Sequence, residues 1–339
     1  THAADFGIEV SGEITVNLQK VVERSRKVAS SLSSGVAHLL KKNKVAVFDG
    51  TAKIAGKSGA NWLISVAGAK QTKLSGKHII IATGARARAL PGIEPNGTSI
   101  VTYKDAMVPQ KMPKSLIVVG SGAIGVEFAS FYNDMGVDVT IVEYLDRILN
   151  AEDEEISEMA KKSFERRGIK IFTSVELAGL KETSSGVTAD IKTGVKSQQL
   201  YAERVIMAVG IVGNSENLGL ETTKVKQERG HIVTDGYGAT DEAGLYAIGD
   251  VTGPPWLAHK ASHEGIICIE NIAGIKHVHP IADNSVPGCT YCRPQIASVG
   301  LTEAKAKDAG YDIKVGTFPF LANGKAIALG DKEGLIKTI

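Results

Sequence analysis

The stretch Leu116-Ile-Val-Val-Gly-Ser-Gly-Ala-Ile-Gly125 decides the fold of this 339-residue chain. Its apolar run leads into three glycines, and a helix-like segment follows over Val126 to Met135. A second apolar run, Val137 to Val142, ends on Glu143. A strand, a glycine turn, a helix and a second strand with a terminal acid are the parts that a dinucleotide site requires. The pattern therefore predicts a Rossmann-like unit.

Each residue of this motif has a separate physical role in binding a dinucleotide. Gly120 permits the tight turn, Gly122 lets the backbone approach a pyrophosphate, and Gly125 brings the helix close to the sheet. The helix N-terminus supplies free N–H groups to the phosphates. Ile124, between the second and third glycines, is a further expected cofactor-binding residue. Glu143 can accept hydrogen bonds from both ribose hydroxyls and would repel a 2′-phosphate, so we expect NAD(H) to be preferred over NADP(H).

Length and composition bound the remaining possibilities. The length allows two or three domains, and 43% hydrophobic residues with 37 glycines are typical of a globular α/β protein. A net charge of +2 gives no reason to expect nucleic acid or an anionic membrane as a partner. The apolar runs are of strand length, which predicts no membrane span. Three cysteines are too few for a secreted disulphide framework, so we expect a bacterial cytoplasm or an organelle matrix.

Two parts of the chain repeat one pattern. Arg204 to Gly210 and Lys77 to Gly84 are both apolar runs that end in a small residue and a glycine, as a strand closing a nucleotide domain would. Two related nucleotide domains are therefore predicted. Ahead of them, apolar residues at helical spacing predict a long amphipathic helix over Asn17 to Lys42. Short strands are predicted after this helix, over Val45 to Phe48, Trp62 to Val66 and His78 to Ala82.

A second cofactor motif lies at Ala239 to Asp250, where a threonine and a turn precede an apolar strand that ends in Gly249-Asp250. Flavoproteins deliver an aspartate to the ribityl chain of FAD in this way. Gly249 would allow close approach of the backbone, and Asp250 would accept from hydroxyls beside the next helix N-terminus. The alternative is a buried strand that ends in an ordinary turn aspartate, but Ala82-Thr83-Gly84 favours the flavin interpretation.

The first predicted nucleotide domain has no glycine fingerprint between Thr1 and Gly76. If the two domains are related, the opening βαβ unit of the first lies upstream of Thr1. The strand-like ending at Ile339 suggests in the same way that the polypeptide continues.

Together these motifs resemble the flavoprotein disulphide reductases with two dinucleotide sites, and among them the dihydrolipoamide dehydrogenases. Tyr291 to Glu303 resembles the beginning of that family's dimerisation domain, although Cys292-Arg293-Pro294-Gln295 stands where many members have Thr-His-Pro-Glu. The stretches that carry the resemblance are Ile81 to Arg86, Gly120 to Phe128, Val142-Glu143, Tyr246 to Asp250 and, most discriminating, Leu257 to Gly265.

The resemblance implies an α/β fold with two Rossmann-like dinucleotide-binding domains, one for FAD and one for NAD, and the start of an α+β dimerisation domain. It also implies a homodimer with two-fold symmetry. The expected bounds are 1–112 for the FAD domain without its opening part, 113–238 for the NAD domain, 239–285 for the return to the FAD or central domain, and 286–339 for a truncated dimerisation domain.

The activity that the resemblance implies is the oxidation of dihydrolipoyl groups in 2-oxoacid dehydrogenase complexes. Electrons would pass through a redox disulphide and FAD to NAD⁺, and the partner would be the lipoyl domain of a dihydrolipoyl acyltransferase or a related lipoyl protein. The redox cysteine pair is expected upstream of Thr1, and an acid/base His-Glu pair downstream of Ile339.

Site residues follow from the same resemblance. Glu127 is the expected catalytic residue, because it resembles the family glutamate near the nicotinamide and flavin, where it pairs with a lysine upstream of this chain. His259 is expected to orient or pack rather than to catalyse. The expected NAD-binding residues are Gly120, Gly122, Ile124, Gly125, Glu143 and Gly210, and the expected FAD-binding residues are Ala82, Thr83, Gly84, Asp250, Leu257, Ala258 and His259.

Other interpretations stay open at this point. An NADH oxidase or a transhydrogenase would share the nucleotide motifs, and a truncated scaffold could bind nucleotides without catalysis. Cys289-Thr-Tyr-Cys292 invites a zinc or redox interpretation, but a lone pair without nearby ligand histidines is a weak signal, and no metal site is expected. Cys268, within an apolar run, is expected to be a buried small hydrophobe.

Overall fold

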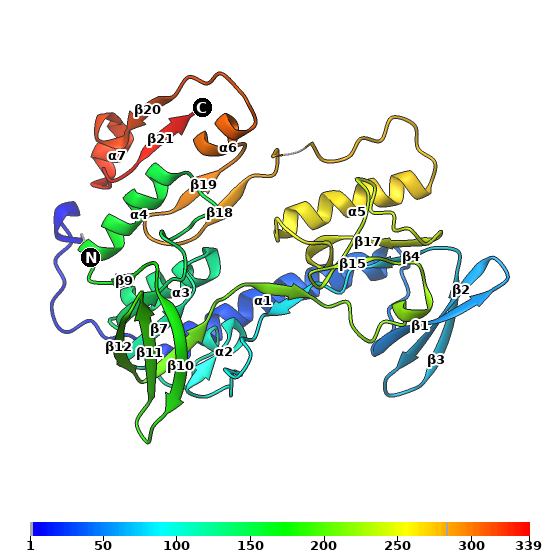
Figure 1. Cartoon of the computed structure of the whole chain (residues 1–339), viewed down its shortest axis with the longest axis horizontal. Helices are drawn as coiled ribbons and strands as arrows, with labels where there is room; N and C mark the ends of the chain where they lie inside the picture. The colour runs from blue at the N-terminus through cyan, green and yellow to red at the C-terminus, as the bar shows by residue number, and fades with distance from the viewer. Residues whose placement is uncertain (1–2, 283) are drawn as a thin grey trace. The chain divides into compact units, whose positions relative to one another are not determined.

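The structure is a computed structural model that describes residues 3–282 and 284–339 (Figure 1). Its chain forms two compact units. The first unit comprises Thr1–Arg26, Ala89–Val209 and Cys289–Ile339, and the second comprises Lys27–Arg88 and Gly210–Gly288. Each unit contains a core of its own.

The first unit is built on a five-stranded parallel sheet with the strand order β6-β13-β7-β8-β9. From β7 the chain moves outward through β8 to β9, and then returns to the other side of β7 as β13. The order therefore reverses beside β7, which is where open α/β sheets bind ligands. This topology confirms the predicted Rossmann-like unit. The strands are β6 (Ile100–Val101), β7 (Ser115–Val119), β8 (Asp138–Val142), β9 (Lys170–Phe172) and β13 (Arg204–Met207).

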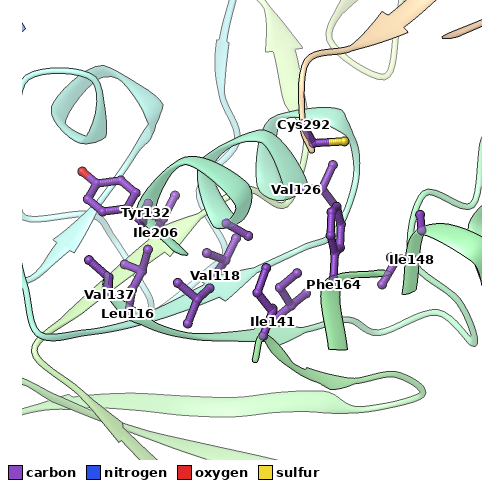
Figure 2. Close-up of a cluster of buried hydrophobic side chains, with 14 of the residues drawn as sticks. Leu116, Val118, Val126, Tyr132, Val137, Ile141, Ile148, Phe164, Ile206 and Cys292 are labelled. Carbon is purple, nitrogen blue, oxygen red and sulfur yellow. The ribbon is translucent and has the colours of Figure 1, made fainter. Parts of the chain in front are cut away.

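Strand β7 is buried on both faces, and its side chains alternate between two cores. Leu116 and Val118 pack in one cluster with Val126 of α3 (Ala123–Asp134) and Phe164 of α4 (Glu154–Arg166), as Figure 2 shows. Ile117 and Val119 pack in the other cluster, on the opposite face. Each fully buried aliphatic side chain stabilises the fold by roughly 1.5–3 kcal/mol. A short helix, α2 (Tyr103–Ala106), follows β6.

An antiparallel sheet of β10, β11 and β12 contributes to the second of these clusters. Val187, Ala189 and Ile191 alternate along β11 toward the core, while the residues between them are more exposed. This alternation of period two is what a half-buried strand requires. The strands are β10 (Glu176–Glu182), β11 (Val187–Thr193) and β12 (Lys196–Ala202).

The C-terminal segment of the first unit joins its core through Cys292 and Ile296. It also carries exposed large apolar side chains, among them Tyr291, Phe318 and Leu321. Its elements are β18 (Gly288–Thr290), β19 (Ile296–Ser298), α6 (Glu303–Asp308), β20 (Gly316–Pro319), α7 (Gly324–Leu329) and β21 (Leu335–Thr338).

The second unit is assembled from small sheets. An antiparallel sheet contains β1 (Thr51–Ser58), β2 (Asn61–Ala67) and β3 (Thr72–Gly76). Trp62, Ile81 and Leu245 belong to its core. The paired strands are β4 (Ile79–Ile81) with β17 (Leu245–Ala247), in parallel, and β5 (Ala85–Ala87) with β14 (Ile211–Gly213) and β15 (Gln227–Glu228) with β16 (His231–Ile232), both antiparallel. One long helix, α5 (Ala258–Ile272), follows. The 3-10 helices of the two units are η1 (Ala3–Phe6), η2 (Leu220–Thr222), η3 (Gly249–Thr252) and η4 (Phe320–Ala322).

Two predictions about the N-terminal region have different outcomes. The predicted helix is confirmed as α1 (Leu18–Lys42), although none of its residues is buried. The predicted strand over Val45 to Phe48 is wrong, because these residues have no strand conformation and are exposed. A run of β-branched and aromatic residues forms a strand only where a neighbouring strand accepts and donates its backbone hydrogen bonds. Among the described residues, no helix is long and apolar enough to cross a membrane.

The two units divide the chain at other positions than the expected domain bounds. The division falls at Val209 and Gly210 rather than near residue 238. The reason is that β14 pairs with β5, which draws the segment after Val209 into the second unit. Compact units and family domains are different divisions of a chain, and the domain bounds given above stay predictions.

Candidate functional site

The glycine turn after β7 leaves no room for side chains at two of its three glycines. Gly120 has a φ of +96°, and a Cβ there would collide with the carbonyl oxygen of Ala208. A Cβ at Gly125 would collide with the carbonyl oxygen of Gly120. A Cβ at Gly122, in contrast, would meet nothing within 4 Å. Gly120 and Gly125 are thus required by the fold, whereas Gly122 keeps open the space in which a pyrophosphate would lie.

The N-terminus of α3 opens from this turn. Its N-cap residue is Gly122, which has no side chain to accept a hydrogen bond from the first turn of the helix. The N–H groups of the first turn, including that of the half-buried Ile124, therefore have no capping side chain. Such groups, together with the helix dipole, favour an anionic ligand.

Glu143 follows β8 and is only 9% exposed. Its Oε2 accepts hydrogen bonds from the backbone N–H of Ser121, at 2.8 Å, and from the Ser121 hydroxyl, at 2.5 Å. Its Oε1 accepts from the N–H of Leu145, at 2.8 Å. Three donors hold the carboxylate beside the glycine turn, and a carboxylate with about four lone-pair sites retains capacity for a further donor. The residues present thus fit a dinucleotide.

Ser121 is a site residue that the sequence reasoning missed. It is 1% exposed, and its hydroxyl is the only side-chain donor that the described residues direct at Glu143. The sequence feature that could have indicated Ser121 is its position between the first two glycines, together with an acid at the end of the neighbouring strand. A short hydroxyl side chain at that position can reach the acid.

Glu127 lies on α3, half-buried, and its Oε1 accepts a hydrogen bond from the backbone N–H of Tyr291, at 2.7 Å. The C-terminal segment of the first unit thereby fixes this carboxylate. The Ser130 hydroxyl, one turn further along α3, accepts from the N–H of Arg293, at 2.9 Å. Arg167 adds hydrogen bonds to the carbonyl oxygen of Arg293 and to Asp134.

The two cysteines of the Cys289-x-x-Cys292 motif form no disulphide in this structure. Both cysteines are free thiols, and Cys292 is 5% exposed. Burial raises the pKa of the Cys292 thiol to about 11, and the charge of Glu127 acts in the same direction. A thiol with such a pKa is a poor nucleophile at neutral pH. Within the described residues, no three His, Cys, Asp or Glu side chains gather where they could hold a metal ion. Cys268 is fully buried, as predicted.

In the second unit, the residues after β4 are tied to the segment after β14. The Thr83 hydroxyl donates to the carbonyl oxygen of Asn214 at 2.6 Å, and the Asn214 amide donates to the carbonyl oxygen of Thr83 at 2.9 Å. Ala82 and Thr83 are exposed, and Gly84 has a φ of +70°. The turn that the sequence predicted for the flavin site is therefore exposed to solvent, and its hydrogen bonds with Asn214 hold it in place.

The turn η3 carries the expected flavin ligand, Asp250, which is half-buried. Helix α5 follows, and its N-cap residue Leu257 makes no side-chain cap. Ala258 and His259 are exposed in its first turn, and His259 Nε2 lies 2.9 Å from the carbonyl oxygen of Pro287. An acceptor carboxylate beside an uncapped helix N-terminus fits a ligand with both hydroxyls and phosphates, as FAD has.

The expected site residues are thus divided between the units. Those for FAD all lie in the second unit, and those for NAD in the first, except that Gly210, with a φ of +104°, is the first residue of the second.

The family model for pyridine nucleotide-disulphide oxidoreductases matches residues 4–265, and the model for the dimerisation domain of these proteins matches residues 286–339. Among curated relatives, the dihydrolipoyl dehydrogenase of Rhizobium etli is 53% identical, over 100% of this chain and 73% of its own length. The dihydrolipoyl dehydrogenase of Bacillus subtilis is 41% identical, over 99% of this chain and 72% of its own length.

Solved structures agree with the fold. LpdA from Mycobacterium tuberculosis superposes with a TM-score of 0.90 at 28% identity, covering 99% of this chain and 72% of its own. The Cu(II) complex of a variant of RclA, an HOCl-induced flavoprotein disulphide reductase from Escherichia coli, gives a TM-score of 0.85 at 25% identity, covering 93% and 71%.

Proposed function

This chain belongs to the dihydrolipoyl dehydrogenases, within the pyridine nucleotide-disulphide oxidoreductase family, and we propose specific roles for its residues in that reaction. Dihydrolipoyl dehydrogenases are NAD-dependent flavoprotein disulphide oxidoreductases, so the cofactors are FAD and NAD. When bound, FAD supplies a two-electron carrier between a dithiol and NAD⁺. The matched dimerisation domain supports a homodimer.

The first unit binds NAD(H) in this proposal. Gly122 and the N–H groups at the start of α3 hold the pyrophosphate, with Gly120 and Gly125 shaping the turn. Glu143 accepts from the ribose hydroxyls and, by its charge, excludes a 2′-phosphate. The observation that carries this assignment is the Glu143 carboxylate, which Ser121 and Leu145 hold beside the glycine turn by three hydrogen bonds.

Glu127 acts at the nicotinamide end of the same site. It lies on α3 beyond the glycine turn, where the N–H of Tyr291 fixes one of its carboxylate oxygens and leaves the other available. We assign it the catalytic contact with the cofactor. Since a segment of the dimerisation domain supplies the Tyr291 N–H, the position of Glu127 depends on the packing of that domain.

The second unit binds FAD in this proposal, through Asp250, the start of α5 with Leu257, Ala258 and His259, and the turn at Ala82, Thr83 and Gly84. The substrate is a dihydrolipoyl group on the lipoyl domain of an acyltransferase or a related lipoyl protein. Free thiols at Cys268, Cys289 and Cys292 are consistent with a reducing compartment, the bacterial cytoplasm or an organelle matrix.

Anaerobic spectroscopy of the purified full-length protein tests the proposal. Dihydrolipoamide is expected to bleach the flavin absorption band, and NAD⁺ is expected to restore it with the formation of NADH. A flavin that dihydrolipoamide leaves oxidised would contradict the substrate, and equal restoration by NADP⁺ would contradict the assignment of Glu143.

A further inference from the structure

A buried ion pair lies behind the turn that carries Asp250, and the roles proposed above do not use it. Lys260 is 7% exposed, and its Nζ lies 3.0 Å from Oε1 of Glu264, one helical turn further along α5. The Glu264 side chain is 23% exposed. Taking a lysine out of water is unfavourable unless its charge is paired and its donors are satisfied. A solvent-exposed ion pair at this spacing would contribute little to stability. Because burying the pair is costly, its burial needs a structural reason.

The contacts of the two side chains give that reason. Lys260 Nζ donates to the carbonyl oxygen of Gly253, at 3.1 Å, and lies 3.3 Å from the Thr252 hydroxyl oxygen. Oε2 of Glu264 accepts from the backbone N–H of Gly249, at 2.7 Å. Gly249 and Gly253 are the two ends of the turn that contains Asp250. The ion pair therefore fastens both ends of this turn to α5.

The turn needs such fastening because of its backbone. Gly249 has a φ of +75° and Gly253 a φ of +106°, which glycine adopts readily but does not hold by itself. Inside the turn, the Thr252 hydroxyl donates to the carbonyl oxygen of Gly249, at 2.8 Å. This bond closes the turn but does not orient it relative to the N-terminus of α5. Lys260 and Glu264 supply that orientation.

We propose that Lys260 and Glu264 are positioning residues for FAD, which set Asp250 relative to the uncapped start of α5. The proposal rests on the function proposed above, since it takes Asp250 as a flavin ligand. The pair makes no contact with the cofactor in this scheme. Its effect is on FAD affinity, because a turn that must be ordered at the moment of binding weakens the complex.

The experiment measures the dissociation constant of FAD for the flavin-stripped full-length protein. The main variant is the double substitution Lys260→Met with Glu264→Gln, which keeps side-chain length and leaves no uncompensated buried charge. We expect the FAD dissociation constant to rise about tenfold or more, the effect of losing hydrogen bonds to charged groups. The single variant Glu264→Gln keeps Lys260 on the carbonyl oxygen of Gly253 but leaves its charge without a carboxylate, so its FAD dissociation constant is also expected to rise.

Lys226→Met is the matched control. Lys226 pairs with Asp241 at 2.6 Å in the same unit, but its side chain is 71% exposed and lies outside the turn. It is expected to change FAD affinity by less than about twofold. NADH affinity is measured on every variant as an internal reference for the first unit, and is expected to stay constant.

Three results would overturn the proposal. An FAD dissociation constant that is unchanged in the double variant, whatever its thermal stability, would show that the ion pair does not position Asp250. A fall in NADH affinity equal to the fall in FAD affinity would show general loosening of the protein. If the unsubstituted protein holds no FAD, the proposed function itself fails, and the inference fails with it.

Discussion

The two cofactor regions of this chain are organised in different ways. In the first unit, the glycine turn follows a strand that is buried on both faces, and Glu143 is fixed by three hydrogen bonds. In the second unit, β4 and β17 form a two-stranded sheet, and Asp250 lies in a turn whose ends are held by the charges of Lys260 and Glu264. The first region owes its geometry to packing and the second to an ion pair. A packed region is sensitive to a change in side-chain volume, whereas a region held by an ion pair is sensitive to the loss of one charge. The two regions should therefore respond differently to substitution.

The largest expected effect tests the packed region. Gly125→Ala would place a methyl group against the carbonyl oxygen of Gly120, so that α3 has to move away from β7. We expect a loss of roughly 1–3 kcal/mol in the free energy of unfolding and complete loss of NADH binding. Thermal unfolding and calorimetric titration measure the two quantities. Gly35→Ala, within helix α1 where a Cβ meets nothing within 4 Å, is the control for adding a methyl group to a helix without a collision. NADH binding that survives Gly125→Ala would mean that packing does not fix the turn.

Glu143→Gln removes the charge at the packed site and keeps its shape. The loss of a charged acceptor is worth about 1.5–3 kcal/mol, so kcat/KM for NAD⁺ is expected to fall about 10- to 100-fold. The preference over NADP⁺ should shrink at the same time, because the repulsion of a 2′-phosphate is gone. Steady-state rates with both cofactors measure this change. FAD content should be unaffected, and a variant that also loses flavin would break the separation between the two regions.

Lys337→Met shows whether the packed unit also depends on charge. The Lys337 side chain is 7% exposed and contacts carboxylates of Asp153, Glu155 and Glu303 at 2.8, 3.2 and 2.8 Å. We expect a loss of about 2 kcal/mol in stability, because two of these partners are partly solvated and the rest of the penalty for unpaired charges is screened. Chemical denaturation, monitored by a spectroscopic probe in the first unit, measures this loss of stability. Lys170→Met, from an exposed pair with Asp138, is the control.

The same cluster gives a pH dependence with a defined sign. Burial by itself would raise the pKa of Asp153, but hydrogen bonds from Lys337 and from two backbone N–H groups hold it below its ordinary value of 3.8. Burial likewise opposes the charge of Lys337, yet its carboxylate partners raise its pKa above 10.5. The stabilisation is therefore fully present between about pH 4 and pH 10. It is lost as the pH falls through the lowered pKa of Asp153, or rises through the raised pKa of Lys337. Lys337→Met should flatten the acid limb of the stability profile.

Gly122→Ala separates binding from folding within the packed region. A Cβ at this position meets nothing within 4 Å, and the φ of −68° suits alanine, so stability should be unchanged. The methyl group would occupy the space in front of the helix N-terminus, and NADH affinity should fall about tenfold. Thermal unfolding and titration with NADH measure the two quantities. A loss of stability, or an unchanged NADH affinity, would contradict the role of Gly122 in binding rather than folding.

Ser121→Ala has the smallest expected effect. It removes one of the three donors to Glu143 and leaves both backbone donors in place. A net loss of about 0.5–1.5 kcal/mol corresponds to roughly a 2- to 10-fold rise in the KM for NAD⁺, with kcat unchanged. A fall in kcat instead of a rise in KM would show that Ser121 acts on the reaction step and not on the ribose site.

The sequence predicts the packed region better than the other, and the reason is physical. The glycine turn, its two strands and Glu143 are specified by local patterns, and the structure contains them as predicted. Ser121 on Glu143 and Tyr291 on Glu127 depend on contacts between residues far apart in the chain, so spacing alone does not reveal them. The strand expected at Val45 to Phe48 failed for the same reason, because a local pattern does not state whether a partner strand is present.

The alternation of β7 between two apolar cores has a consequence for how its alignment is determined. In a strand with one wet face, a slip by one residue exposes apolar groups, and this penalty fixes the register. Leu116 to Val119 carry no such penalty, since a slip would only exchange one apolar cluster for the other. The alignment must then be set at the end of the strand, where only a residue without a side chain fits against the carbonyl oxygen of Ala208. Gly120 thus fixes the register of β7 in the sheet, independently of cofactor binding.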